Sequence, residues 1–476
     1  MVFDPNLSKS PVQRAVEETL ALSASRLDGN VRRQRAKAAM VLECTLHGYS
    51  EAKIAAVAAR AQISTASIYR DFGDREALLV QSLEWVIAMF AQHWVTDTCE
   101  QEPIKRIEAL LLAHGTALSD PFMGWIFRLY VHLANTSAPH LLVMARAARD
   151  ANLAFWSAEI SKLQLSGQIQ VSDSSVLVAI LLGAIERRSI FARMAFGEND
   201  HHEPKLEMVA EHTALALFQV YGTKIFWQGQ SGAEGVGRRA LGKDVAQIAL
   251  PLKPLMDMPS QRLKEYGQRV LSRDVNRLDS DGRKVRVQLA AMLECIEVGY
   301  EAATMASVAA RAGVSTATLY IDYPDKKALF LDAIVLQSRF RVDYYGLIGA
   351  SASKTDTIAS LVYSISSVLA DPDFLWFHRV SMASEFSNAP LLIQSSRDTR
   401  SHTEAFWLDY LATLVEVGFL EAHDKGLIMN LLLGATQRRS VLSMVFFGAS
   451  DVSQHNIAQL ACASTDFVLR LIGSRA

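Results

Sequence analysis

The chain has 476 residues, more than one ordinary hydrophobic core holds, so several domains are expected. Its formal net charge is −2 and its sequence pI about 6.6, so any nucleic-acid binding must depend on a local surface. The longest apolar runs, such as 176–185, fall short of the roughly 20 residues that span a bilayer. Four cysteines without a CxxC pair argue against a disulfide framework, and the N-terminus lacks a signal-peptide layout. We therefore expect a cytoplasmic protein without membrane contact.

The predicted elements are almost all helices. Ala, Leu, Arg and Glu dominate, apolar residues recur at i, i+3 and i+4, and Gly and Pro fall between the periodic runs. Residues 11–27 and 259–278 each show this spacing, which predicts an extra helix at both places. The stretch 223–259 is glycine-rich in its first half and predicts a flexible linker. The expected fold class is all-α.

The chain contains an internal repeat. The segment GYSEAKIAAVAARAQISTASIYRDFGDREALL, which starts at Gly48, matches GYEAATMASVAARAGVSTATLYIDYPDKKALF, which starts at Gly299. The same offset of 251 positions joins further pairs, among them Pro139 with Pro390, Trp156 with Trp407 and Gly183 with Gly434. Chance does not keep one ungapped register over most of both halves. The protein is therefore predicted to be a duplicated unit of roughly 200 residues.

The residues around the start of this segment predict a long helix, a short helix and a tight turn after it. In the second copy an amphipathic helix over 283–297 is closed by Gly299. Thr304 then opens a short helix over 305–312, and Gly313 suits a tight turn after it. Alanines where the two short helices cross allow a close approach of their backbones.

A further short helix and a longer one follow that turn. Ser315 is a good N-cap for a helix over 316–321, and Asp325 caps the helix that starts at Lys326. Two short helices joined by a turn of three or four residues predict a helix-turn-helix in each copy.

The order of these parts resembles the tetracycline-repressor (TetR) family of bacterial regulators. The family pattern IAxxAGVSxxTLYxxFxxKxxL appears as VAARAGVSTATLYIDYPDKKALF in the second copy and VAARAQISTASIYRDFGDREALL in the first. The resemblance covers roughly a quarter of each copy. The resemblance implies DNA-binding heads, helical ligand-binding and dimerisation domains, and a bacterial protein that associates with the nucleoid when bound to DNA.

The resemblance divides the chain as two tandem copies of an N-terminal helix-turn-helix domain plus a C-terminal helical domain. The predicted order is a helical N-terminal extension (1–31), a first helix-turn-helix domain (32–80), a first helical ligand and dimerisation domain (81–222), a linker with a second helical leader (223–281), a second helix-turn-helix domain (282–331) and a second helical ligand and dimerisation domain (332–476).

Hydroxyl, tyrosine and basic side chains near the short helices suit contacts with phosphates and base edges. In the TetR family, residues matching Thr304, Thr316, Tyr320 and Lys326 touch phosphates, which carries over to Lys53, Thr65, Tyr69 and Arg75. The predicted DNA-binding residues are Arg32, Arg33, Lys53, Ser64, Thr65, Ser67, Tyr69, Arg70 and Arg75 in the first copy, and Arg283, Lys284, Thr304, Ser315, Thr316, Thr318, Tyr320 and Lys326 in the second.

The two heads depart from each other at three positions. Gln62 stands where the second copy has Gly313, and a turn with positive φ would strain a glutamine. Lys53 replaces the hydroxyl of Thr304, and Arg70 matches Ile321. These differences predict an operator of two related but imperfect inverted half-sites.

Family members act as homodimers through their last two long helices. The matching segments here are 174–196 with 207–221, and 425–447 with 456–472. Their apolar faces favour pairing of the copies within one chain, an intramolecular pseudodimer, with further self-association left open.

Aromatic residues gather in the helical domains, where the family encloses its effector. The candidate pocket residues are Trp85, Met89, Trp94, Trp125, Tyr130, Met144 and Phe155 in the first copy, and Phe340, Tyr345, Trp376 and Phe406 in the second. Aromatic residues at helical spacing also form ordinary cores, so the positions where the copies differ are the better indicators. These differences favour two unlike pockets, of which one binds an apolar effector.

No metal-ligand spacing, phosphate loop, nucleophile motif or paired carboxylates appear in the sequence, so we expect neither a cofactor nor an enzyme. Cys44 and Cys295 occupy matching apolar positions and are expected in the core, with a redox sensor as the minor alternative. The main hypothesis is a repressor that an effector releases from double-stranded DNA. Two alternatives are a DNA-binding regulator without a small-molecule effector, and an interaction module whose DNA heads have decayed.

Overall fold

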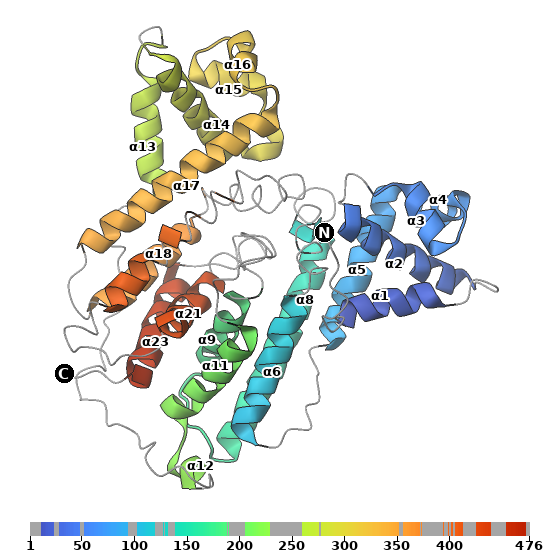
Figure 1. The fold of residues 1–476 in the computed structure, drawn as a ribbon, viewed down its shortest axis with the longest axis vertical. Helices are drawn as coiled ribbons and strands as arrows, with labels where there is room; N and C mark the ends of the chain where they lie inside the picture. Colours follow the sequence, from blue (N-terminus) through green and yellow to red (C-terminus); the bar gives the residue numbers. More distant parts are fainter. Residues whose placement is uncertain are drawn as a thin grey trace. The chain divides into compact units, whose positions relative to one another are not determined.

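The computed structural model describes residues 11–22, 28–47, 52–93, 102–119, 127, 129–131, 139–187, 189, 205–228, 259–275, 278–351, 356–371, 373, 394, 398, 401–402, 405–412, 425–438 and 454–472. In these residues all regular elements are helices, beside one isolated β-bridge between Ile169 and Gly222 (Figure 1). The all-α prediction is confirmed. The helices form two compact units, with α1 to α12 in unit 1 and α13 to α23 in unit 2, and the division at 237–238 falls inside the predicted linker.

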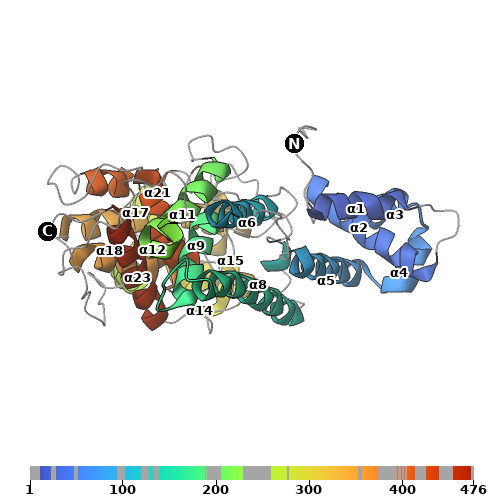
Figure 2. The same ribbon diagram turned by 90° about the horizontal axis from the view of Figure 1, so that it is seen from below.

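The first five helices of unit 1 form a small head (Figure 2). They are α1 (Pro11–Ala21), α2 (Gly29–His47), α3 (Ile54–Ala61), α4 (Thr65–Phe72) and α5 (Arg75–His93). Helix α2 packs against α1, α3 and α5, because its alanines and Met40 are fully buried and let the neighbours approach closely. The helix-turn-helix is thus where the sequence predicts it, and the first extra helix begins at the predicted residue.

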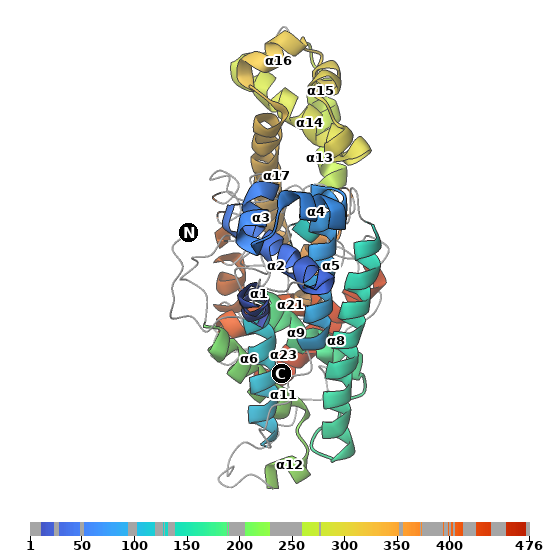
Figure 3. The same ribbon diagram turned by 90° about the vertical axis from the view of Figure 1, so that its right-hand side faces the viewer.

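Unit 2 begins with a matching head (Figure 3). It consists of α13 (Pro259–Leu271), α14 (Ser280–Ala302), α15 (Met305–Ala312), α16 (Thr316–Asp322) and α17 (Lys326–Ser351). Gly299 interrupts α14 with φ +82° and ψ 161°, a conformation that only glycine adopts without strain, so the predicted helix end lies there. Both leader helices end earlier than expected, at Ala21 and Leu271.

The remaining helices of unit 1 form a second layer of packing. They are α6 (Pro103–Leu118), α8 (His140–Leu165), α9 (Ser174–Glu186), α11 (Leu206–Tyr221) and α12 (Lys224–Gln228). Helix α6 packs on α9 and α11, and α8 packs on both α5 and α9. Helix α5 therefore joins the head to this helical domain.

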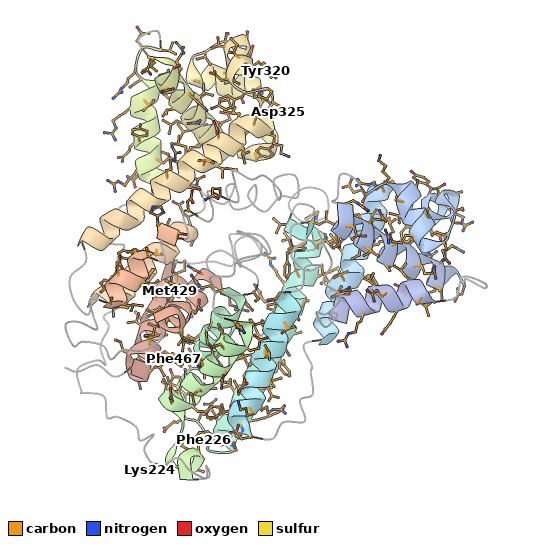
Figure 4. All side chains as sticks on the ribbon, viewed as in Figure 1. Lys224, Phe226, Tyr320, Asp325, Met429 and Phe467 are labelled. Atoms are coloured by element: carbon orange, nitrogen blue, oxygen red, sulfur yellow. The ribbon has the colours of Figure 1, made fainter. Side chains whose placement is uncertain are left out.

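The start of the predicted linker is helical in the structure. The ring of Phe226 in α12 stacks on Phe218 of α11, with 4.4 Å between centroids. Figure 4 labels Phe226. This tertiary contact orders residues 224–228, so the prediction of a flexible linker from residue 223 is wrong at its beginning.

In unit 2 the described helical part comprises α18 (Asp356–Leu369), residues 405–412, α21 (Lys425–Gln437) and α23 (Gln454–Ile472). Helix α23 packs on α18 and α21, with Phe467 fully buried. Within the described residues, no helix is both long and apolar enough to cross a membrane.

Candidate nucleic-acid interface

The two short helices α4 and α16 begin with the same hydroxyl cap. The backbone N–H of Ser67 donates to the Ser64 hydroxyl at 3.1 Å, and that of Thr318 donates to the Ser315 hydroxyl at 3.0 Å. This bond satisfies one of the free N–H groups of the first turn and fixes where each helix begins. The predicted N-cap role of Ser315 is confirmed.

Each of these helices buries one face and exposes the other. Ile68 and Leu319 are 0% and 1% exposed and fasten the helices to their heads. Tyr69 and Tyr320 are 52% and 53% exposed, so both phenol rings are available to a partner; Figure 4 labels Tyr320. Thr65 and Thr316 are exposed as well. The two heads thus present the same hydroxyl and tyrosine pattern.

The turn between the two short helices has the left-handed conformation that the sequence predicts. Gln62 lies at φ 56° and Gly313 at φ 69°, and both donate their N–H to the end of the preceding helix. Among the described residues, Gln62 is the one non-glycine residue with positive φ. The strain expected of a glutamine in this turn is therefore present.

The start of the first short helix differs between the heads. Thr304 accepts a hydrogen bond from the Ser307 N–H at 3.0 Å, and Ser307 accepts one from the Thr304 N–H, which completes a capping box. At the matching position Lys53 makes no capping bond within the described structure. Both side chains are exposed.

The cations that open α5 and α17 lie against the same part of each head. Asp74 and Asp325 cap these helices, each accepting a backbone N–H at 2.7 Å. The Arg75 Nε donates to the Ala52 carbonyl at 3.0 Å, whereas the Lys326 Nζ lies 4.2 Å from the centre of the Tyr300 ring. Both predicted phosphate ligands therefore also have partners inside the protein.

The basic start of α2 is partly engaged. Arg32 forms two hydrogen bonds with the Asp71 carboxylate, at 2.6 and 3.1 Å, and thereby lowers the pKa of that carboxyl. Arg33 is exposed.

In unit 2, Arg283 is exposed, while the Lys284 Nζ lies 2.9 Å from the Asp332 carboxylate. The structure thus exposes Arg33, Arg70, Arg283 and Lys284. Of these, Arg70 is also paired with Asp71, as Arg32 is, and Lys284 with Asp332.

Sequence reasoning missed a buried arginine that ties each leader helix to its head. The Arg35 guanidinium donates to the carbonyls of Ala61, Leu20 and Leu22 at the ends of α3 and α1. The matching Arg286 donates to four carbonyls in unit 2, those of Ala312, Val270, Leu271 and Arg273. The available signal was that an arginine occupies the same repeat position in both copies.

The predicted pocket residues are only partly within the described structure. Tyr130 is buried, which raises the pKa of its hydroxyl, and Trp85, Met89, Met144, Phe155 and Phe406 are half-buried. Trp94, Trp125 and Trp376 lie outside the described residues. Phe340 and Tyr345 belong to α17, and their side chains are also outside the described part. The structure does not bring these residues together into one described site.

The helical interior of unit 1 instead contains two polar groups of side chains that the sequence analysis missed. The His114 Nε2 lies 3.1 Å from the Glu186 carboxylate, both groups being buried, and the imidazole lies edge-on to Trp156. Burial opposes ionisation of Glu159, but its bonds from Arg106 and Lys162 outweigh that effect and lower its pKa. In unit 2 the positions matching His114 and Glu186 are Ile365 and Gln437.

Within the described residues, no three His, Cys, Asp or Glu side chains come together as a metal site. Cys44 and Cys295 are buried, and burial raises the pKa of the Cys44 thiol to about 12. A thiol with so high a pKa is almost entirely protonated at neutral pH and therefore a poor redox sensor.

Comparison with known proteins gives one family match and two similar solved structures. The profile of the family described as bacterial regulatory proteins, tetR family, matches residues 37–81 and 289–333. A solved structure from Mesorhizobium loti, described as a TetR-family transcriptional regulator, shares 19% identity and has a TM-score of 0.36, covering 42% of this chain and 100% of that one. A TetR transcriptional regulator from Agrobacterium tumefaciens gives 18% identity and a TM-score of 0.33, over 40% and 95%.

No curated protein matches the sequence. The two profile matches fall on the two heads, α2 to α5 and α14 to α17. The chain therefore carries the DNA-binding domain of the tetR family of bacterial regulatory proteins twice, once in each unit.

Proposed function

We propose that the chain is a single-chain repressor that binds an imperfect palindromic operator through both heads and is released by a small, largely apolar effector. The observation that carries the proposal is the pair of matched outward surfaces, with a Ser cap and a half-exposed tyrosine on both α4 and α16. Hydroxyls and aromatic hydroxyls at a helix N-terminus suit phosphate and base-edge contacts.

In this proposal α9 and α11 of unit 1 pair with α21 and α23 of unit 2 as the subunits of a dimer would. The linker keeps the units at an effective concentration of about a millimolar, so pairing does not depend on the amount of protein. The protein acts in the bacterial cytoplasm and on the nucleoid. No catalytic step is part of the proposal.

The test is a gel-shift titration of the full chain on DNA from its own upstream region, across a salt series. The mass of the complex is measured in solution at the same time. Tight, salt-sensitive binding of one chain per imperfect palindrome supports the proposal. Two chains per site would replace it with a higher assembly, and no sequence-specific binding there or on genomic fragments would favour the interaction module.

Effector release is tested separately, by adding hydrophobic compounds to the preformed complex and following release and thermal stability. An effector raises the melting temperature of the free protein and lowers its affinity for DNA. If no compound alters DNA binding and none raises the melting temperature of the free protein, the chain would be a regulator without a small-molecule effector.

A further inference from the structure

The outward face of the two recognition helices carries one large chemical difference. In α4, Ile68 and Phe72 are buried, and Arg70 lies midway between them along the chain. At about 100° per residue, this places Arg70 about 180° around the helix from the buried side. Its side chain is 63% exposed. Arg70 is therefore at the centre of the face that a groove would receive.

The matching position of α16 is occupied by Ile321. Leu319 and Tyr323 are 1% and 3% exposed and fasten this helix, while Ile321 between them is 83% exposed. Packing of the head does not require a β-branched apolar residue at this place, and such residues are only moderate helix formers. The feature that Ile321 shares with Arg70 is its position on the outward face.

The residue one turn earlier makes this position accessible to a base. Ala66 and Ala317 precede Arg70 and Ile321 by four residues, lie on the same face and are exposed. A methyl side chain there lets the helix backbone come close to the floor of a groove. Because both helices have this alanine, the main chemical difference on the outward face lies one turn later, at Arg70 in α4 and Ile321 in α16.

The two side chains suit different bases. A guanidinium donates two hydrogen bonds to O6 and N7 of guanine, whereas an aliphatic side chain suits the C5 methyl of thymine. The Asp71 carboxylate beside Arg70 accepts two bonds from Arg32, at 2.6 and 3.1 Å, and only a longer one from Arg70, at 3.3 Å. The weaker bond is the one that a guanine would replace.

The two heads also differ in net charge, and the more positive one is the head that carries Arg70. Residues 28–81 contain eight Lys and Arg against six Asp and Glu, a net charge of +2. Residues 279–332 contain six against eight, a net charge of −2. The first head is therefore expected to be attracted to DNA phosphates more strongly than the second.

We propose that Arg70 reads a guanine in one half-site and Ile321 reads a thymine at the matching position of the other, so that the operator departs from its palindrome at this base pair. This inference depends on the proposed function, because it assumes that both heads contact one operator.

The test uses the operator located by footprinting and the full chain. Replacing the guanine of the first half-site by 7-deazaguanine, which removes N7 and keeps O6, is expected to weaken binding by about 2- to 13-fold. Replacing the thymine of the other half-site by deoxyuridine, which lacks the methyl group, is expected to weaken it about fourfold.

The reciprocal variants Arg70→Ile and Ile321→Arg make the assignment sharper. Arg70→Ile is expected to prefer an operator with thymine in both half-sites, and Ile321→Arg one with guanine in both. Lys105→Ile removes an exposed cation from α6 and is the matched control, expected to keep the natural preference. Thermal melting checks that each variant is folded. If Arg70→Ile does not fold, Arg70→Lys, whose side chain cannot donate two hydrogen bonds to guanine as a planar fork, tests the same contact.

Two results would overturn the inference while leaving the proposed function intact. One is equal weakening of Arg70→Ile on all sequences with a salt slope lower by about one, which would make Arg70 a phosphate ligand. The other is an unchanged base preference in Ile321→Arg. A wild-type chain that binds no DNA specifically would instead remove the proposed function itself.

Discussion

At the residue scale, the buried arginines Arg35 and Arg286 connect elements that the chain alone would leave loose. Each guanidinium receives its compensation from backbone carbonyls at helix C-termini, where the last carbonyls lack partners and the helix dipole is negative. Burial lowers the pKa of Arg286. An arginine nevertheless stays charged at any ordinary pH.

Replacing Arg286 by methionine should destabilise the second head by about 2–4 kcal/mol, because it leaves several buried carbonyls without a donor. Urea unfolding measures the change, and Arg283→Met on the exposed surface is the control. Hydrogen exchange should show that α13 loses protection first. Equal stability of the two variants would show that the carbonyls find other partners.

Replacing Gln62 by glycine should stabilise the first head by about 1 kcal/mol, because glycine removes the steric cost of a left-handed residue. The reverse change, Gly313→Gln, should destabilise the second head by a similar amount. An added Cβ at Gly313 would lie 3.4 Å from the Arg286 Nη2, which adds slight crowding. Thermal melting of both variants tests the pair, and a loss of stability in Gln62→Gly would contradict the interpretation.

The ion pair of Asp71 with Arg32 should contribute to the acid stability of the first head. The bond from Arg32 lowers the folded-state pKa of Asp71 below its unfolded value. The stabilisation is therefore complete above the unfolded pKa and disappears as the pH falls through the folded one. Asp71→Asn should flatten this acid limb in pH-dependent unfolding, and adding Arg32→Met should change it little further. An unaltered acid limb would count against the pair.

At the element scale, the caps determine how sharply the helices were predicted. Residues 305–312 form the predicted helix with the predicted bounds. Thr304, an N-capping residue, and Gly313, which adopts a left-handed conformation, mark its two ends in the sequence. Helix α12 was missed because its stability comes from the stacking of Phe226 on Phe218, a tertiary contact that no local pattern shows. The leader helices end at Ala21 and Leu271. The carbonyls of Leu22 and Leu271, at these ends, accept hydrogen bonds from Arg35 and Arg286.

The candidate interface was predicted in outline but not in its pairings. Exposure of Tyr69 and Tyr320 follows from helical spacing, whereas the ion pair of Arg32 with Asp71 joins residues far apart in the sequence. The polar contact of His114 with Glu186 could not be predicted either, because it also joins residues far apart in the sequence.

The missing cap of α3 gives a prediction at this scale. Lys53→Thr should stabilise the first turn of α3 by about 0.5–2 kcal/mol, as a hydroxyl cap does, while removing one cation that we propose to contact a phosphate. Hydrogen exchange at the start of α3 measures the first effect and the salt slope of DNA binding the second. Thr304→Lys is the matched reverse change, and a capping effect with the same sign in both variants would disprove the exchange.

At the scale of the whole molecule, the linker should determine how DNA affinity depends on protein concentration. A protease site inserted in the GQSGAEGVG stretch, at 229–237, allows the chain to be cut after folding. The cut protein should bind the operator as well as the intact chain at high concentration and lose affinity on dilution, whereas intact protein should not. Identical dilution curves for both would show that the tether does not assist pairing.

The exposed Arg70 and Ile321 have a consequence for how such a regulator evolves. In a homodimer every substitution in a reading head occurs twice on the operator, so a change in binding energy is doubled. In a fused chain it occurs once, and the other head still holds the site while the mutated one acquires a new preference. Each half-site can thus drift with its own head through intermediates that keep regulating.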